Sequence, residues 1–188
     1  MAKILFIHPP SRRRVYLNTN VKVGSPDYPD LTLATLAGHL KGKHILKALD
    51  MELFLNYQDT LIQTLNIFKP DVVVSSSKSA DFKVMIEIIK IVKSINKDIQ
   101  TVVGGVHITT NPDVAKQIEE VDVAAVGEGD YILPLILNGG SLKDIQGIIY
   151  RQNGAIVENG KRKEFLNINK LPFPNWEMFD ISIYKNSR

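Results

Sequence analysis

The stretch TVVGGVHITTNPDVAKQIEEVDVAAVGEGD, residues 101–130, contains two short apolar runs that each end in glycine. The first run leads into GG at residues 104–105, and the second leads into GEG at residues 127–129. Apolar runs without polar alternation are typical of strands that are buried on both faces of a parallel sheet. Glycine at the end of such a strand indicates either a turn of the backbone or the close approach of another group.

The same alternation of apolar runs and helical patterns extends over most of the chain. The runs expected to form strands are residues 4–7, 44–49, 71–77, 100–103 and 122–126. Between them, apolar residues recur every three or four positions, which is the spacing of amphipathic helices. We therefore predict a doubly wound α/β fold, Rossmann-like or flavodoxin-like, with five parallel strands in the order 2-1-3-4-5.

The pattern changes after the glycine pair at residues 139–140. Two β-type runs, residues 147–151 and 155–157, flank Asn-Gly, a dipeptide that supplies the positive φ angles of a tight hairpin turn. An extended, aromatic segment, LPFPNW, follows at residues 171–176. We expect one domain over residues 1–140, and over residues 141–188 a C-terminal β-hairpin with an extended tail that links to a further domain.

Composition excludes several classes of protein and site. A hydrophobic content of 44% and a net charge of +3 are ordinary for a soluble protein, and the charge is too small to indicate nucleic-acid binding. With no cysteine, the chain cannot hold a disulfide, a thiolate metal site or an iron–sulfur cluster. No apolar run approaches the roughly 20 residues of a membrane span, and the apolar start is too short for a signal peptide. We expect a cytoplasmic protein without a membrane partner.

The carboxyl ends of the predicted strands are the expected ligand site, because ligands of open parallel sheets bind there. The candidate cofactor-binding residues at these ends are His8, Pro9, Pro10, Ser75, Ser76, Ser77, Gly104, Gly105, Val106, His107, Gly127, Glu128 and Gly129. They offer amide donors, hydroxyls and space, but no nucleophile paired with a base. The four histidines lack the spacing of a zinc site. We therefore assign no catalytic residue and no metal ligand.

A nucleotide cofactor in one of its usual modes is disfavoured. A dinucleotide site needs GxGxxG directly after the first strand, and a phosphate-binding loop needs GxxxxGK followed by Ser or Thr. Neither pattern occurs, and the first strand ends in His-Pro-Pro. A long loop rich in Pro, Gly, Asn and Ser follows, to about Asp30. It carries the basic run of residues 12–14, and loops of this length are more often functional than idle.

Four motifs together resemble one known module. They are IHPP at residues 7–10, GGVH at 104–107, GEGD at 127–130 and LPFPNW at 171–176. In this order and spacing they resemble the N-terminal cobalamin (vitamin B12)-binding domain of cobalamin-dependent radical S-adenosylmethionine (SAM) proteins, including relatives of the anaerobic magnesium-protoporphyrin IX monomethyl ester cyclase. The resemblance covers nearly the whole chain.

The resemblance implies a module that holds a corrinoid for methyl transfer or related radical chemistry in a downstream radical SAM domain. The 4Fe-4S cluster and S-adenosylmethionine would belong to that missing domain, so the chain alone is not expected to be catalytic. The glycines at residues 104–105 would clear a path for the nucleotide tail of the cofactor. The serines at 75–77 would hydrogen-bond it, and residues 8–10 and 127–129 would lie beneath the corrin ring.

The chain departs from the family pattern in two motifs. The nearest match to DxHxxG, whose histidine ligates cobalt, is DMELFL at residues 50–55, with Glu52 in place of His and Leu55 in place of Gly. The nearest match to SxL has Lys78 in place of Leu. We therefore expect no histidine ligand for cobalt from residues 50–55.

An alternative function is a non-catalytic, flavodoxin-like interaction or signalling module that no longer binds a cofactor. A phosphorylated receiver would need acids after the first strand and an aspartate after the third, where this chain has His-Pro-Pro and serines. Simpler roles also remain open for single residues. Gly104 and Gly105 could serve only a turn, His107 could bond the next loop, and Glu128 could favour the start of the next helix.

Overall fold

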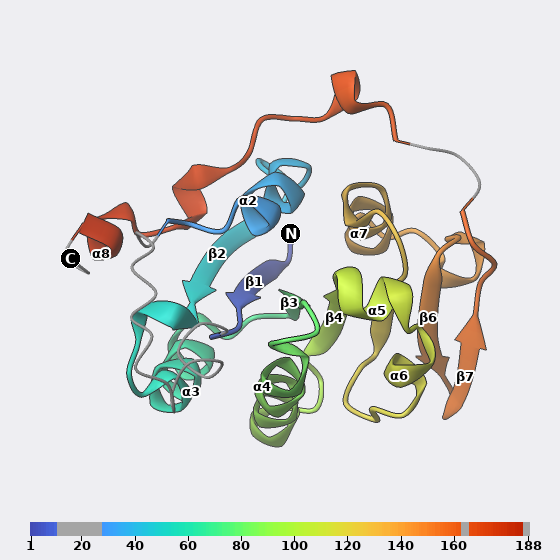
Figure 1. Cartoon of the computed structure of the whole chain (residues 1–188), viewed down its shortest axis with the longest axis horizontal. Helices are drawn as coiled ribbons and strands as arrows, with labels where there is room; N and C mark the ends of the chain where they lie inside the picture. The colour runs from blue at the N-terminus through green and yellow to red at the C-terminus, as the bar shows by residue number, and fades with distance from the viewer. Residues whose placement is uncertain (11–27, 163–165, 186–188) are drawn as a thin grey trace.

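The computed structural model describes residues 1–10, 28–162 and 166–185 (Figure 1). Most of the long loop expected before Asp30, including the basic run at residues 12–14, lies outside the described residues. The described chain forms one seven-stranded sheet with helices on both faces.

The sheet is mainly parallel, as the apolar runs predicted. Its strands are β1 (Lys3–His8), β2 (Ile45–Asp50), β3 (Val72–Ser76), β4 (Gln100–Gly104), β5 (Val123–Ala125), β6 (Ile148–Gln152) and β7 (Ala155–Glu158). They lie in the order β2-β1-β3-β4-β5-β6-β7, with the pairs up to β4–β5 parallel and the last two pairs antiparallel. The doubly wound α/β class is confirmed. The expected count of five strands is wrong, and the expected order 2-1-3-4-5 lacks β6 and β7, which follow β5 in the sheet.

The hairpin extends the sheet instead of standing apart from it. Ala124 of β5 pairs with Ile149 of β6, and Ile148 is fully buried beside it. A five-stranded sheet would leave the outer edge of β5, an apolar strand, with unpaired backbone groups. The hairpin satisfies these groups, which is the physical reason for seven strands in place of five.

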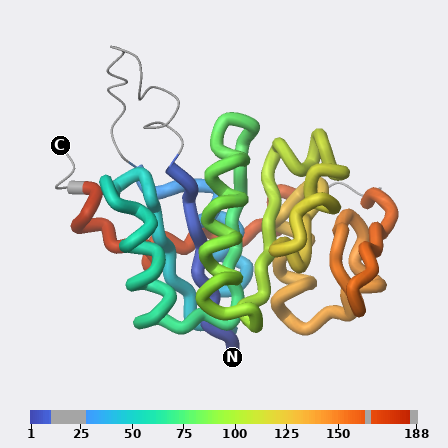
Figure 2. Tube along the Cα trace, turned by 90° about the horizontal axis from the view of Figure 1, so that it is seen from below, coloured from blue at the N-terminus to red at the C-terminus, as the bar shows by residue number. Residues whose placement is uncertain are grey.

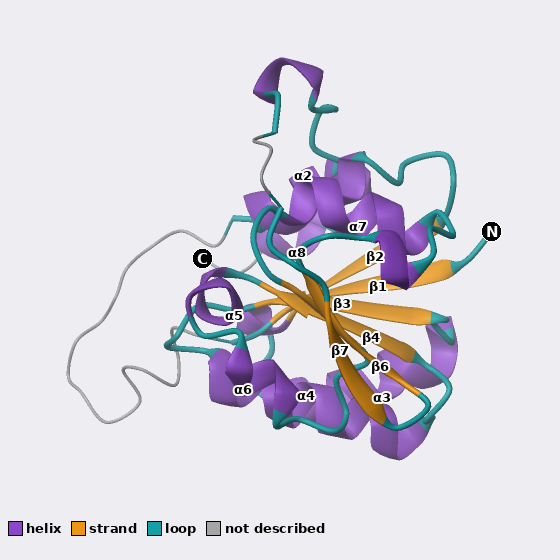
Figure 3. Ribbon diagram, turned by 90° about the vertical axis from the view of Figure 1, so that its right-hand side faces the viewer, coloured by secondary structure: helices purple, strands orange, loops and turns teal. Residues whose placement is uncertain are grey.

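Helices cover the two faces unequally. The helices are α2 (Leu31–Gly38), α3 (Tyr57–Phe68), α4 (Phe82–Ile95), α5 (Val106–Thr110), α6 (Asp113–Lys116), α7 (Gly129–Leu137) and α8 (Ile181–Lys185). Short 3-10 turns are η1 (Met51–Leu53), η2 (Leu142–Asp144), η3 (Ile168–Lys170) and η4 (Trp176–Met178). Figure 3 shows α2 and α7 on one face of the sheet and α3, α4 and α6 on the other.

Side-chain alternation along the strands divides the core between these faces. Ile4 and Phe6 of β1 pack with α2 and α7, whereas Leu5 and Ile7 pack with α3 and α4. The next residue, His8, therefore lies on the α2/α7 side. This alternation decides on which face of the sheet each side chain at a strand end lies, and therefore which of these side chains can reach a ligand on that face.

The last described segment crosses back over the molecule. Residues 171–185, here called the C-terminal strap, run past α2 to the free edge of β2, at the end of the sheet opposite the hairpin (Figures 1 and 2). The backbone amide of Asn175 donates to the carbonyl of Ala34 over 2.8 Å. Phe179 and Tyr184 are buried in the core of the α2/α7 face. The strap thus packs against the same core as α2 and α7.

Candidate functional site

A cleft of about 310 Å³ opens between α2 and α7 at the carboxyl ends of β3, β4 and β5. Its floor consists mainly of small residues: Val74, Ser75, Ser76, Val102, Val103, Gly104 and Ala125. Leu36 of α2 and Leu133 of α7 form the facing walls. The cleft therefore combines an apolar interior with exposed backbone at its mouth, which is the usual character of a small-molecule site.

The two glycines after β4 have different structural causes. Gly105 has a φ of +104°, and a Cβ there would lie 2.3 Å from the carbonyl oxygen of Ser77, so the turn itself requires glycine. Gly104 has no positive φ, and a Cβ there would meet only Ala125, with its Cβ at 3.5 Å and its carbonyl oxygen at 3.7 Å, both ordinary contacts. Nothing in the described protein requires glycine at 104, yet this residue lines the cleft.

The three serines at the end of β3 are not equivalent. Ser75 and Ser76 line the cleft, but the hydroxyl of Ser75 donates to the carbonyl of Ile7 over 3.0 Å. Ser77 is 2% exposed, and its hydroxyl has no hydrogen-bond partner within the described residues. Ser76 lies on the α2/α7 side by alternation and pairs in register with Gly104. Ser76 is therefore the serine best placed to face a ligand in the cleft.

His107 and Glu128 make contacts within the protein. Nδ1 of His107 lies 2.9 Å from the hydroxyl of Ser79, and its ring centroid is 4.1 Å from that of Phe82 on α4. The carboxylate of Glu128 accepts from the backbone amide of Leu166 over 3.1 Å and lies 3.4 Å from Arg162. Of their sequence neighbours, Val106, Gly127 and Gly129 line the cleft, whereas His107 and Glu128 do not.

His8 forms a partly buried ion pair at the end of β1. Its Nδ1 lies 3.2 Å from the carboxylate of Asp30, which also caps α2 by accepting from the amide of Leu33. Burial lowers the pKa of His8, but the bond to Asp30 and the charges of Asp50, Asp30 and Glu52 outweigh it, so that the pKa is raised above 6.5. Burial raises the pKa of Asp30, but His8 outweighs it and the net pKa is below 3.8.

These residues form a row across the sheet. Asp50 pairs with His8, Ile7 pairs with Ser75, and Ser76 pairs with Gly104. Four residues thus lie in neighbouring positions at the carboxyl ends of β2, β1, β3 and β4: Asp50, His8, Ser76 and Gly104. The predicted prolines at 9 and 10 follow directly and are buried.

Comparisons with known proteins identify the fold family. A family model described as the B12 binding domain matches residues 18–137, which is more than half of the chain. The chain belongs to the B12-binding domain family. The resemblance to cobalamin-binding domains of radical SAM proteins is thereby confirmed.

Two curated proteins are similar over 97% of the B12-binding domain chain. One is "Uncharacterized methyltransferase PH0819" of Pyrococcus horikoshii, 26% identical, and the other is "Anaerobic magnesium-protoporphyrin IX monomethyl ester cyclase" of Rubrivivax gelatinosus, 24% identical. The chain spans 40% and 34% of their lengths. A solved radical S-adenosylmethionine methyltransferase, TsrM from Kitasatospora setae with cobalamin and a [4Fe-4S] cluster bound, has the same fold. Its TM-score is 0.68 at 17% identity, over 92% of this chain and 31% of its own.

Reasoning from the sequence missed the helical walls of the cleft in this B12-binding domain. Thr32, Leu36, Thr109, Asp130 and Leu133 also line it. The helical spacing of Leu36 places it in the core but does not say where the core opens. Asp130 carried a signal, since it is the last residue of the GEGD motif.

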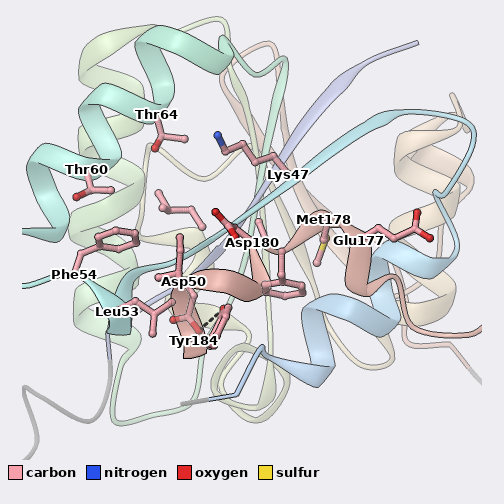
Figure 4. Close-up of a pocket in the computed structure, with 14 residues that line it drawn as sticks. Lys47, Asp50, Leu53, Phe54, Thr60, Thr64, Glu177, Met178, Asp180 and Tyr184 are labelled. Atoms are coloured by element: carbon pink, nitrogen blue, oxygen red, sulfur yellow. Dashed lines mark hydrogen bonds between the residues drawn. The ribbon is translucent and has the colours of Figure 1, made fainter. Parts of the chain in front are cut away.

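A second pocket, of about 370 Å³, lies between β2, α3 and the C-terminal strap (Figure 4). Most of its acids are bonded within the domain. The hydroxyl of Tyr184 donates to Asp50 over 2.9 Å, Lys41 donates to Glu177, and Asp180 accepts from Ser182. Burial raises the pKa of Asp50 above 3.8, although the charge of His8 and the bond from Tyr184 oppose this rise. Of these bonds, the one from Tyr184 to Asp50 joins the strap to β2.

The described residues contain neither a cluster of metal-binding side chains nor a membrane-spanning helix. No group of three or more His, Asp or Glu side chains in the described ranges is placed to hold a metal ion. Within the same ranges, no helix is both long and apolar enough to cross a membrane.

Proposed function

We propose that this B12-binding domain holds a corrinoid at the carboxyl edge of the sheet, with the nucleotide tail of the cofactor in the α2/α7 cleft. The observation that carries the proposal is Gly104. A Cβ there would make only ordinary contacts with Ala125, and the residue lines the floor of the cleft. A glycine that the protein does not need for its own turn is explained by a ligand that passes close to the backbone.

The row of strand ends supports a position for the corrin ring. His8 lies two strands from Gly104, and neighbouring strands are about 4.8 Å apart. A disc whose tail enters the cleft beside Gly104 would extend over the ends of β3 and β1. Ser76 would then lie near the tail, and the His8–Asp30 pair, with Pro9 and Pro10, would lie beneath the disc.

We further propose that the domain works within a larger radical SAM enzyme. The named relatives and the TsrM structure are longer than this chain, and one of them is a radical SAM methyltransferase with cobalamin bound. A further domain would supply the 4Fe-4S cluster and S-adenosylmethionine, because this chain has no cysteine to ligate a cluster. The corrinoid, when bound, would supply a cobalt-bound methyl group or related radical chemistry.

The second candidate is an interaction module without a cofactor. Phe173 of the strap is 95% exposed, and Ile168, in the turn before the strap, is 73% exposed, which favours docking to another protein or domain. If the folded protein binds no cofactor, this candidate is favoured, because docking to a partner does not need an open α2/α7 cleft.

Gel filtration of the protein after incubation with hydroxocobalamin tests the proposal. We expect corrinoid absorbance to co-elute with the protein in stoichiometric amount. Cobinamide, which has the corrin ring but no nucleotide, should bind more weakly, because it leaves the cleft unfilled. If neither corrinoid co-elutes with the folded protein, the hypothesis of an interaction module without a cofactor is favoured.

A further inference from the structure

The α2/α7 cleft contains one carboxylate that the sequence did not single out as a binding group. Asp130 lies in the first turn of α7 and lines the cleft. Its Oδ1 lies 3.5 Å from Nε2 of His39, the residue that follows α2. Both atoms are buried, and neither has a hydrogen-bond partner among the described residues. The ion pair therefore joins the two helices that form the walls of the cleft.

The second oxygen of Asp130 retains its capacity to accept hydrogen bonds. In the described ranges of the chain, Oδ2 takes part in no hydrogen bond or ion pair, and the side chain is 28% exposed. The cleft around it is lined by Leu36, Leu133 and Gly129. A carboxylate in an apolar cleft is stabilised by a hydrogen-bond donor, and a bound ligand could supply one.

Stabilisation of α7 accounts for only part of this arrangement. An acid in the first turn of a helix is favoured by the helix dipole. That effect requires neither the ion pair with His39 on the opposite wall nor a position on the lining of the cleft. The side chain of Asp130 also forms no hydrogen bond to the amides at the start of α7, within the described residues. The geometry thus favours a role toward the contents of the cleft.

We infer that Asp130, held in place by His39, recognises a ribose hydroxyl of the nucleotide tail. The inference rests on the proposed function and names the part of the nucleotide tail that Asp130 contacts. A carboxylate repels the phosphate of the tail, and the unprotonated base nitrogen can only accept hydrogen bonds. The sugar hydroxyls are the donors that the tail brings into the cleft, and a hydroxyl-to-carboxylate bond is among the stronger hydrogen bonds.

Four ligands separate the parts of the cofactor in a binding experiment. Cobalamin carries the corrin ring and the whole tail, and cobinamide lacks the nucleotide. α-Ribazole carries the base and the ribose, and 5,6-dimethylbenzimidazole is the base alone. Affinities would be measured by absorbance for the corrinoids and by NMR titration for the two weaker ligands. The variants are Asp130→Asn, His39→Leu and, as a matched control in the first turn of α6, Asp113→Asn.

We expect Asp130→Asn to weaken cobalamin and α-ribazole about tenfold and to leave cobinamide and dimethylbenzimidazole unchanged. His39→Leu should weaken the same two ligands by a smaller factor, about threefold, because it removes the group that orients Asp130. Asp113→Asn should change none of the four affinities, since Asp113 pairs with Lys116 on the opposite face.

The remaining outcomes overturn the inference in distinguishable ways. Equal weakening of cobinamide or of the free base would mean that Asp130 acts on the corrin, the base or the fold. Unchanged affinities in Asp130→Asn would mean that the residue does not contact the tail. If the wild-type protein binds α-ribazole but not the corrinoids, the proposed function fails. The sugar contact is still supported in that case if Asp130→Asn weakens the binding of α-ribazole. If it binds none of the four ligands, both fail.

Discussion

The α2/α7 cleft and the strap pocket are similar in size and opposite in chemistry. The α2/α7 cleft, of about 310 Å³, has a floor of small residues and one carboxylate with an accepting oxygen still available. The strap pocket, of about 370 Å³, is bordered by acids that are bonded to Tyr184, Lys41 and Ser182 of the same chain. The two pockets therefore differ in unused hydrogen-bonding capacity and in the size of the lining side chains, not in volume, and these differences are why we propose the α2/α7 cleft as the ligand site.

Gly104→Leu should have the largest effect, because it fills the floor of the cleft. We expect the affinity for hydroxocobalamin to fall at least about 100-fold, while the melting temperature stays within a few degrees of the wild type. The measurement is a titration followed by absorbance, together with a thermal melt.

The matched control for this prediction is Thr64→Leu, which adds bulk to the strap pocket instead. We expect cobalamin affinity to change less than about twofold in this variant. A comparable loss of affinity in Thr64→Leu, or unchanged affinity in Gly104→Leu, would reverse the assignment of the two pockets.

Gly105→Ala should act on the fold and not mainly on the cleft. The added Cβ would lie 2.3 Å from the carbonyl oxygen of Ser77, at a φ of +104°. We expect the free energy of unfolding to fall by about 2 kcal/mol, measured by urea denaturation. An unchanged unfolding free energy would show that the turn does not require glycine, and the distinction between the two glycines would be lost.

Tyr184→Phe tests whether the strap pocket serves the fold. The substitution removes the hydroxyl that donates to Asp50 and leaves the buried carboxylate with one donor fewer. We expect a loss of about 1–2 kcal/mol of unfolding free energy at neutral pH, with cobalamin affinity unchanged. Loss of cobalamin binding in a folded Tyr184→Phe protein would instead connect the strap to the ligand site.

The smallest expected effect is a pH dependence from the His8–Asp30 pair. The folded pKa of His8 is raised above 6.5, so its stabilising contribution is present below that pH and is lost as the pH rises through the folded pKa. The groups that act on it are Asp30, Asp50, Glu52 and, by its charge, Asp81. Melting temperatures would be compared between about pH 6 and pH 9.

We expect the wild type to lose stability over this range relative to His8→Gln, which cannot titrate. The folded pKa of Asp30 is lowered, so its own contribution is present above 3.8 and is lost as the pH falls through the folded value. Parallel curves for the wild type and His8→Gln would mean that the pair contributes no pH-dependent stability.

Much of the fold followed from local pattern, but the sheet edge did not. The apolar runs before Ser75, Gly104 and Gly127 predicted parallel strands, and the strand ends were expected to meet at one edge. The hairpin at residues 147–157 was predicted as a hairpin, but its pairing with β5 was not, because pairing of strands is a long-range choice that local sequence does not encode.

The candidate site divides in the same way. The motifs singled out Ser76, Gly104 and Gly127, which line the cleft. They also singled out His107 and Glu128, whose side chains bond to Ser79, Leu166 and Arg162. Side-chain direction after a strand depends on the turn that follows it, so neighbouring residues of one motif end on different sides.

The sequence by itself determined the alternation of strands and helices, the glycines at the strand ends and the family that these motifs resemble. Hydrophobic periodicity and turn residues act over a few positions and can be read directly. The tertiary structure alone decided that the turn requires glycine at 105 but not at 104, and that His39 and Asp130 face each other. Residues that lie 91 positions apart meet only because α2 and α7 pack side by side on one face of the sheet.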